Sequence, residues 1–280
     1  MNIDNIKIVA DSSADLLELP SVAFESAPLK IITAQKEYVD DAKLDVYSMV
    51  NDLQNYKGKS STSCPNADDW INAFGDAEYI FCVTITGTLS GGYNAALLAK
   101  QTYEEHNPGR RVFVLNSLTT GPEMALIIEK ISELVIAGKE FDEVCDEITK
   151  YSQKTGLLFM LESMKNLANN GRVSPLVAKM AGLLGIRVVG KASDRGDLEP
   201  LNKCRGEMKA LETIVEHMKS LGWKKGKVKI AHCFNENAGI TLKQLIQNEF
   251  SKAKVDLYKC RGLCSFYAEK GGILIGFEKI

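Results

Sequence analysis

The hydrophobic residues of this chain follow two alternating patterns. Short apolar runs, rich in β-branched and aromatic residues, occupy residues 6–10, 79–84 and 111–115. Each run predicts a strand buried on both faces, as in a parallel sheet. Between these runs, apolar residues recur at helical spacing, for example over residues 93–101 and 124–135. Strands that alternate with helices predict a Rossmann-like α/β domain in which helices flank a parallel sheet.

The pattern becomes more mixed after about residue 155. Strands are predicted over residues 157–161, 227–234, 255–260 and 272–277, a hairpin over 186–204, and helices over 206–221 and 238–250. This order is typical of an α+β domain. We therefore predict two domains, an N-terminal α/β domain over residues 1–155 and a C-terminal α+β domain over residues 156–280. The apolar segment 175–184 is predicted to be buried.

Small polar residues follow each of the three predicted parallel strands. The loop at residues 86–92 carries three hydroxyl groups and three glycines, and Asn116 and Ser117 follow the third strand. The carboxyl ends of parallel strands lie at one edge of a sheet, where ligands bind. Free N–H groups at helix starts and side-chain O–H groups at that edge predict an anion-binding site.

A second cluster of hydroxyl groups occupies residues 60–63, directly before a predicted helix over residues 67–74. Asn66, with Asp69 three residues later, has the pattern of a helix cap. Capping does not account for four consecutive hydroxyl groups, which also suit a carboxylate or phosphate oxygen. The sequence leaves both interpretations open.

Composition narrows the class of protein. A chain of 280 residues with 45% hydrophobic and 25% charged residues is typical of a soluble globular protein. A net charge of -2 and a pI of about 6.0 argue against a nucleic-acid binder. No apolar run approaches the ~18 residues of a membrane span, and no signal peptide is evident. Seven cysteines without a CxxC pair predict reduced thiols rather than disulfides or a metal site. We predict a cytoplasmic protein without metal or cofactor.

Several motifs together carry a resemblance to a known family. In chain order they are VADSSADL at residues 9–16, TSCPN at 62–66, TGTLSGGYNAA at 86–96, NSLTTGPEM at 116–124 and GRVSPLVAKMAGLLGIRVV at 171–189. In this order and spacing the chain resembles the DegV family over nearly its whole length. The resemblance implies a two-domain α/β protein that holds a long-chain fatty acid in a tunnel between its domains. It also implies a non-catalytic role, because some members present the carboxyl group to a separate fatty-acid kinase that makes an acyl phosphate.

The resemblance also implies a set of site residues. It places the fatty-acid carboxylate between two pairs of residues, Thr62 with Ser63 and Ser90 with Gly91. Supporting roles fall to Asn116, Ser117 and Arg172. Many members carry a histidine near the carboxylate, and this chain departs from them with Tyr267 or Ser265 in that region. The predicted tail-lining residues are Leu176, Ala178, Met180, Leu183, Leu184, Ile186 and Val188.

Other functions receive less support from the sequence. A nicotinamide-dependent oxidoreductase needs a glycine fingerprint after the first strand, which is lacking. A hydrolase or acyltransferase with Ser90 as nucleophile is the main alternative, although the first glycine of GxSxG is missing and none of the three histidines is an evident partner. A third interpretation is a protein-interaction module, which a basic stretch around residues 203–229 would support.

Overall fold

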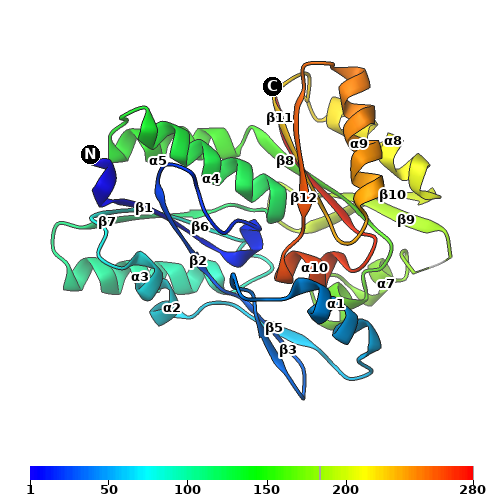
Figure 1. Ribbon diagram of the computed structural model, residues 1–280, viewed down its shortest axis with the longest axis horizontal. Helices are drawn as coiled ribbons and strands as arrows, with labels where there is room; N and C mark the ends of the chain where they lie inside the picture. Colours follow the sequence, from blue (N-terminus) through cyan, green and yellow to red (C-terminus); the bar gives the residue numbers. More distant parts are fainter. Residues whose placement is uncertain (183, 280) are drawn as a thin grey trace.

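The N-terminal half of the protein is a parallel sheet covered by helices on both faces (Figure 1). The computed structural model describes residues 1–182 and 184–279. The sheet has the strand order β2-β1-β6-β7, formed by β1 (Ile6–Asp11), β2 (Ala23–Ala27), β6 (Tyr79–Thr84) and β7 (Arg111–Asn116). All of its strand pairs are parallel, which confirms the predicted α/β architecture.

Two pairs of helices bury the faces of this sheet. On one face α2 (Ala67–Phe74) and α3 (Gly92–His106) pack Trp70, Phe74 and Tyr103 against the strands. On the other face lie α4 (Gly121–Ile136) and α5 (Phe141–Ser152), with Ile127, Ile131 and Phe141 in the core. Apolar side chains on both faces of β1 and β6 therefore find partners, as the continuous apolar runs predicted.

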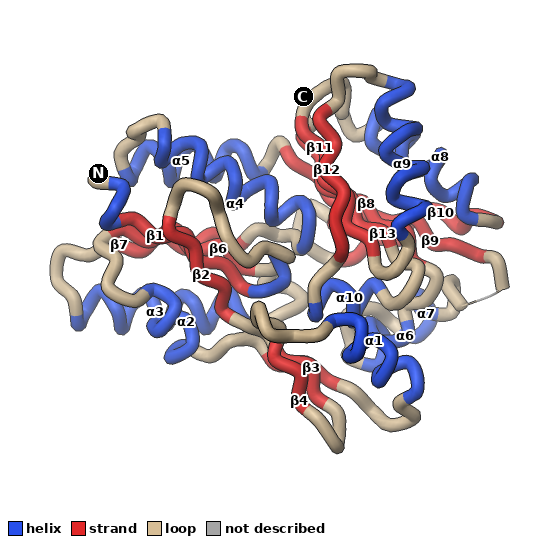
Figure 2. The backbone as a smooth tube through the Cα atoms, in the orientation of Figure 1, coloured by secondary structure: helices blue, strands red, loops and turns tan. Residues whose placement is uncertain are grey.

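The C-terminal half is built on a mixed sheet, separate from the first (Figure 2). Its strand order is β10-β9-β8-β13-β11-β12. The strands are β8 (Thr155–Leu161), β9 (Ile186–Ala192), β10 (Leu198–Arg205), β11 (Lys227–His232), β12 (Lys254–Lys259) and β13 (Ile273–Glu278). Helices α8 (Glu207–Ser220) and α9 (Glu236–Glu249) cover one face. The start of β8 at Thr155 supports the domain division at residues 155 and 156, which stays a proposal.

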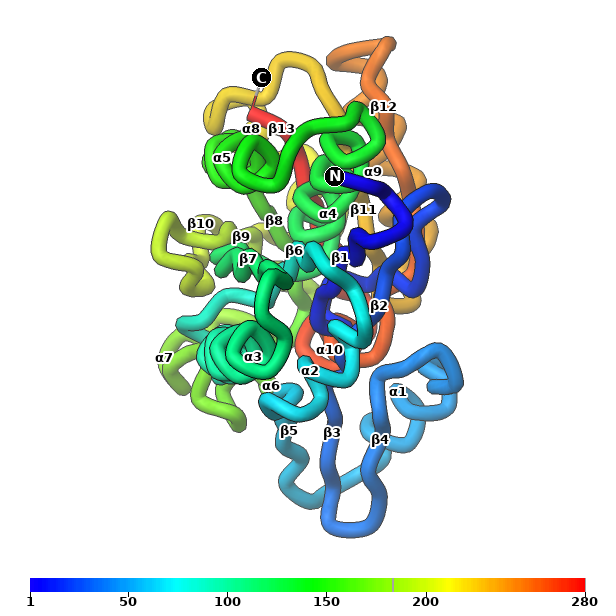
Figure 3. The backbone as a smooth tube through the Cα atoms, turned by 90° about the vertical axis from the view of Figure 1, so that its left-hand side faces the viewer, coloured from blue at the N-terminus to red at the C-terminus, as the bar shows by residue number. Residues whose placement is uncertain are grey.

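A third sheet, called here the small sheet, has the order β4-β3-β5. It consists of β3 (Lys30–Ile32), β4 (Glu37–Val39) and β5 (Ser61–Ser63), with α1 (Val46–Asn55) between β4 and β5 in the chain. Its β3–β4 hairpin projects from the body of the molecule (Figure 3). The hydroxyl cluster at residues 60–63 includes a short strand, because Ser61, Thr62 and Ser63 pair with β3.

The face of the mixed sheet opposite α8 and α9 carries three short helices. They are α6 (Lys165–Asn169), α7 (Pro175–Ala178) and α10 (Gly262–Ala268). Helix α10 also contacts the small sheet, where Phe266 packs with Ile31 and Tyr38. The segment at α10 therefore joins the small sheet to the C-terminal half.

The prediction that residues 175–184 are buried is wrong for the part that the structure describes. Leu176 is 78% exposed and Leu184 is fully exposed, whereas Ala181 is buried. The helix formed here is only four residues long and cannot bury a continuous apolar stretch. Leu183 lies outside the described residues. No helix in the described residues is long and apolar enough to span a membrane.

Candidate functional site

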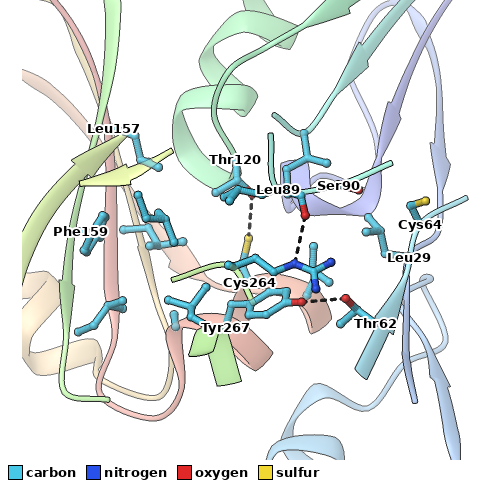
Figure 4. Close-up of a pocket in the computed structure, with 18 of the residues that line it drawn as sticks. Leu29, Thr62, Cys64, Leu89, Ser90, Thr120, Leu157, Phe159, Cys264 and Tyr267 are labelled. Atoms are coloured by element: carbon cyan, nitrogen blue, oxygen red, sulfur yellow. Dashed lines mark hydrogen bonds between the residues drawn. The ribbon is translucent and has the colours of Figure 1, made fainter. Parts of the chain in front are cut away.

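A cavity of about 270 Å³ lies where the small sheet, the loops of the parallel sheet and the mixed sheet meet (Figure 4). Its polar residues come from β5, the loop before α3, the turn after α6, and α10; they are Thr62, Ser63, Ser90, Gly91, Arg172 and Tyr267. Its apolar wall is made largely of leucines, namely Leu29, Leu89, Leu157, Leu161, Leu167, Leu198, Leu263 and Leu274, together with Ile85, Phe159 and Ala268. Thr120, Cys64 and Cys264 complete the lining.

The hydroxyl groups of Thr62 and Tyr267 meet directly. Thr62 Oγ1 and Tyr267 Oη are 2.8 Å apart although the residues are 205 positions apart in the chain (Figure 4). Burial raises the pKa of the Tyr267 hydroxyl, while the bond to Thr62 and the nearby Arg172 charge oppose that rise. Tyr267 therefore remains a protonated donor at neutral pH, unlike the histidine that the family resemblance led us to compare it with.

The loop before α3 brings backbone donors to the same end of the cavity. Ser90 Oγ accepts a hydrogen bond from the Gly92 N–H at 3.2 Å, and Gly91 is the N-cap residue of α3, without a side-chain cap. The N–H groups of a first helical turn lack intrahelical acceptors. A Cβ placed on Gly91 would lie 3.4 Å from Cys64 Sγ, so this loop lies close to the end of β5. The two predicted hydroxyl clusters are therefore neighbours.

Arg172 orders this end of the cavity. Its Nε donates to the Leu89 carbonyl at 3.1 Å and another guanidinium nitrogen donates to the Asn170 carbonyl. The guanidinium carbon also lies 5.9 Å from the centre of the Tyr267 ring. Because these carbonyls occupy Arg172 donors, the side chain holds the loop before Ser90 in place.

Asn116 and Ser117 do not line this cavity. Asn116 Oδ1 accepts from the Gly87 N–H at 3.0 Å and from the Leu118 N–H at 3.3 Å, which ties the loop after β7 to the loop after β6. Ser117 Oγ donates to the Thr119 carbonyl at 3.2 Å. Both residues line a separate cavity of about 280 Å³, whose wall includes Glu123 and Thr155. Asn116 therefore contacts the loop that carries Ser90, whereas the side-chain bond of Ser117 stays within its own loop. The supporting role of both residues stays a prediction.

The apolar wall of the cavity differs from the predicted tail-lining set. Leu157, Phe159 and Leu161 are alternate residues of β8 and therefore point to one face of the sheet. Figure 4 shows the first two of them beside the cavity. Within the described residues, no member of the predicted set from segment 176–188 lines the cavity. Val188 is fully buried in the same core cluster as Phe159 and lies opposite Leu161 in the sheet, and Leu176 is exposed to solvent.

Sequence reasoning missed the apolar wall of the cavity and other lining residues from many separate segments. Leu29, Ile85, Thr120 and the α10 residues Leu263 and Cys264 join the site only because distant parts of the fold meet there. In a half-buried strand, the alternation of polar and apolar residues identifies the buried face. Every residue of β8 is buried, so its sequence does not show which face lines the cavity. Of the two residues proposed near the expected histidine, only Tyr267 lines the cavity. Ser265 is buried and donates to the Cys260 carbonyl at 3.1 Å.

The geometry gives little support to a nucleophilic Ser90. The chain has three histidines, and His106, His217 and His232 all lie outside the cavity lining. His232 is buried at the end of β11, where its Nδ1 accepts from the Asn235 N–H.

All seven cysteines are free thiols. Within residues 1–182 and 184–279, no group of three potential metal ligands is gathered at one point.

Comparisons with known proteins agree with this architecture. The DegV family model matches residues 5–279. A DegV domain-containing protein of Streptococcus pneumoniae is 43% identical over 276 residues, which cover 97% of this chain and 98% of that protein. Among solved structures, a DegV family protein from Eubacterium eligens loaded with heptadecanoic acid has a TM-score of 0.96 and 42% identity, covering 98% of this chain and 100% of its own. The Streptococcus pneumoniae Fatty Acid Kinase (Fak) B3 protein, loaded with linoleic acid, has the same TM-score and identity, with 98% and 99% coverage.

Proposed function

The chain belongs to the DegV family, and on that premise we propose that it binds one long-chain fatty acid in the cavity between its sheets. The carboxylate would lie among Thr62, Ser63, Ser90, Gly91 and Tyr267, with Arg172, Asn116 and Ser117 in supporting positions. The observation that carries this proposal is a single cavity with hydroxyl groups at one end and leucines along its wall.

The two parts of such a ligand match the two parts of the cavity. Burying each CH₂ group contributes about 0.8 kcal/mol, so a tail of about 16 carbons supplies most of the affinity. Hydroxyl and backbone N–H donors satisfy the carboxylate oxygens, each such bond to a charged group contributing about 1.5–3 kcal/mol. The tail therefore provides affinity, and the polar end fixes the orientation of the acid.

We further propose that the protein has no catalysis of its own and presents the bound acid to a separate fatty-acid kinase. The similarity to the Fak B3 protein supports this role. So does the composition of the polar end, where hydroxyl groups outnumber the one arginine, and two of the five N–H donors of Arg172 already bond to the Leu89 and Asn170 carbonyls. A bidentate arginine would cover the oxygen that has to attack the phosphoryl donor. Such a partnership would take place in the cytoplasm, which is where we place the protein.

The experiment that tests the ligand is native mass spectrometry of the purified protein, followed by denaturation, extraction and identification of the released molecule. A stoichiometric species with the mass of a long-chain fatty acid is the expected result, and it would also give the chain length. A protein that carries no lipid and also fails to take up added palmitate or oleate would refute the proposal. A covalent Ser90 adduct with a phosphonate probe would instead support the hydrolase or acyltransferase alternative.

A second experiment addresses the kinase partner. Arg205 and Lys203 at the end of β10 are exposed, whereas Lys229, from the same basic stretch, is buried and paired with Glu129 at 2.6 Å and Asp256 at 2.9 Å. Only part of the basic stretch is therefore available to an acidic partner. Charge reversal by Arg205→Glu should weaken a kinase complex without releasing lipid, while Lys150→Glu, at an exposed position of α5 outside the basic stretch, is the control. Unchanged partner binding would exclude this face.

A further inference from the structure

The small sheet contacts α10 at two points, one at each end of the helix. Asp40, the residue after β4, meets the start of α10, and Thr62 of β5 meets Tyr267 near its end. The strands that carry these two contacts are both paired with β3, because Lys30 is opposite Val39 on one side and Ile31 is opposite Thr62 on the other. Between the contacts, Phe266 packs on Ile31 and Tyr38. A single three-stranded unit therefore fixes both ends of α10.

The contact at the start of α10 is a carboxylate with two backbone donors. Asp40 is only 1% exposed. Its Oδ1 accepts from the Gly262 N–H and its Oδ2 from the Leu263 N–H, each at 2.9 Å. These are donors of the first helical turn, which have no acceptor within the helix. The Arg261 Nε lies 4.0 Å from Asp40 Oδ1 and is the cation closest to it among its described ion pairs.

Gly262 lets the carboxylate come this close. A Cβ built at this position would lie 2.6 Å from Asp40 Oδ1 and 2.6 Å from Leu44 Cδ2, well inside van der Waals contact. A side chain at residue 262 would therefore force the Asp40 carboxylate or α10 to shift, and either shift would disturb the contact. The contact therefore depends on two separate features: the charged carboxylate of Asp40, and the lack of a side chain at Gly262.

Helix α10, whose start Asp40 holds, carries part of the proposed carboxylate site. Tyr267 lies about one helical turn beyond Leu263, so a shift or rotation at the start of α10 changes the position of its hydroxyl group. Leu263, Cys264 and Ala268, on the same helix, line the cavity as well. Asp40 itself does not line the cavity and reaches the ligand only through α10.

We propose that Asp40 is a positioning residue for the fatty-acid carboxylate: by holding the first N–H groups of α10, it sets the Tyr267 hydroxyl beside Thr62. This inference rests on the proposed function. It predicts that Asp40 contributes to the selectivity for a carboxylic acid over an uncharged ligand with the same tail. A residue with only a general effect on stability would weaken the binding of both ligands alike.

The test compares palmitic acid with hexadecanol, which has the same tail length without the carboxyl group. The variants are Asp40→Asn, which replaces one of the two acceptor oxygens by an NH₂ group that cannot accept from an N–H, and Gly262→Ala, which leaves the charge intact. Asp41→Asn is the matched control, because the Asp41 carboxylate accepts only from the neighbouring Lys43 N–H. We expect the ratio of the two dissociation constants to fall about tenfold in both test variants, the effect of one hydrogen bond to a charged group, and to stay unchanged in the control.

A double variant gives a sharper criterion. Tyr267→Phe removes the hydroxyl group through which Asp40 is proposed to act, so adding Asp40→Asn to it should lower the acid selectivity little further. Fully additive effects, or equal weakening of both ligands by Asp40→Asn, would overturn the proposal.

Amide hydrogen exchange separates this inference from the proposed function. In the protein as purified, Asp40→Asn should speed exchange over residues 261–268 relative to wild type and to Asp41→Asn, whatever the ligand is. Suppose that wild-type protein failed to bind palmitate, but Asp40→Asn still raised exchange over residues 261–268. The fatty-acid proposal would then fail, whereas the role of Asp40 in holding α10 would stand. Unchanged exchange over residues 261–268 would refute the positioning role directly.

Discussion

Hydroxyl groups rather than charged side chains dominate the polar end of the cavity. Thr62, Ser90 and Tyr267 can each donate one hydrogen bond to a carboxylate and can also accept one from a neighbour. The structure uses this property, because the Thr62 and Tyr267 hydroxyls bond to each other and Ser90 accepts from the Gly92 N–H. In this arrangement one hydroxyl of the Thr62–Tyr267 pair donates to the other, so the second hydrogen of that pair and the Ser90 hydrogen are left to turn toward an incoming carboxylate.

Replacing Ser90 tests this arrangement at the level of one atom. Ser90→Ala should weaken fatty-acid binding by about 1.5–3 kcal/mol, the contribution of one hydrogen bond to a charged group. Ser61→Ala is the control, since Ser61 is exposed in the same strand as Thr62 and lies outside the cavity lining. Titration calorimetry with palmitate would measure both. Full retention of affinity in Ser90→Ala would remove Ser90 from the site.

Asp15 provides a prediction of stability against pH. Burial raises the pKa of its carboxyl from 3.8 to about 8, although its Oδ1 accepts from the Arg261 N–H at 2.9 Å. Between these two pKa values the unfolded chain has lost the proton that the folded protein keeps. This group therefore lowers the free energy of unfolding as pH rises from about 4 to about 8, by roughly 1.4 kcal/mol per pH unit.

Asp15→Asn should remove that contribution while keeping an oxygen for the Arg261 N–H. We expect the variant to gain stability over wild type progressively from pH 5 to pH 8, as measured by urea unfolding at both values. Asp4→Asn, at an exposed position, should show no such gain. An equal change at both pH values would mean that Asp15 is ionised throughout this range.

At the scale of secondary structure, elements with a strong local pattern could be predicted and others could not. The strand at residues 79–84 has the predicted bounds because its apolar run ends abruptly at the glycine loop. The cap of α2 is the predicted one, with reciprocal bonds between Asn66 and Asp69. Strand β2 was missed because it is an edge strand with alternating exposure, and α10 because its seven residues hold no helical repeat.

The strength of the local sequence pattern also decided how much of the candidate site could be predicted. Thr62, Ser63, Ser90 and Gly91 stand in recognisable motifs and all line the cavity. The apolar wall depends on which face of β8 turns toward α10. That is decided by pairing with β13, more than a hundred residues away in the chain, and with β9, which follows β8 more closely. A run of seven buried residues contains no such information. The predicted tail-lining segment was therefore wrong, although the ligand class implied by the motifs matches the ligands of similar structures.

The packing of α4 on β13 supports a prediction about how elements fit together. A Cβ built at Gly276 would lie 2.3 Å from the Glu123 backbone nitrogen and 2.4 Å from the Pro122 carbonyl carbon. Backbone atoms cannot move aside as a side-chain end can. Gly276→Ala should therefore force α4 away from the strand and lower the free energy of unfolding by about 1–3 kcal/mol or more.

Gly58→Ala is a suitable control, because its added methyl group meets only the end of the Tyr56 side chain in an exposed loop. Chemical unfolding of both variants would measure the difference. Equal stability of Gly276→Ala and wild type would show that the two elements are less tightly packed than this geometry requires.

For the whole molecule, the position of the cavity matters more than any single contact. Its lining draws on the small sheet, the loops of the parallel sheet, the mixed sheet and α10, which are far apart in the chain. A ligand in this cavity contacts all of these parts at once and would be lost when any of them unfolds. Ligand binding and the stability of the whole fold should therefore be coupled.

That coupling can be measured on delipidated protein. A long-chain acid at a free concentration about 100 times its dissociation constant should stabilise the fold by about 2.7 kcal/mol, which corresponds to a rise in Tm of roughly 5 °C. Octanoate has the same carboxylate but lacks about eight CH₂ groups, each contributing about 0.8 kcal/mol, so at the same concentration it should leave Tm nearly unchanged. Equal shifts from both acids would mean that the carboxylate alone binds. In that case the leucine wall would be ordinary core, and the proposed tail site would lie elsewhere or not exist.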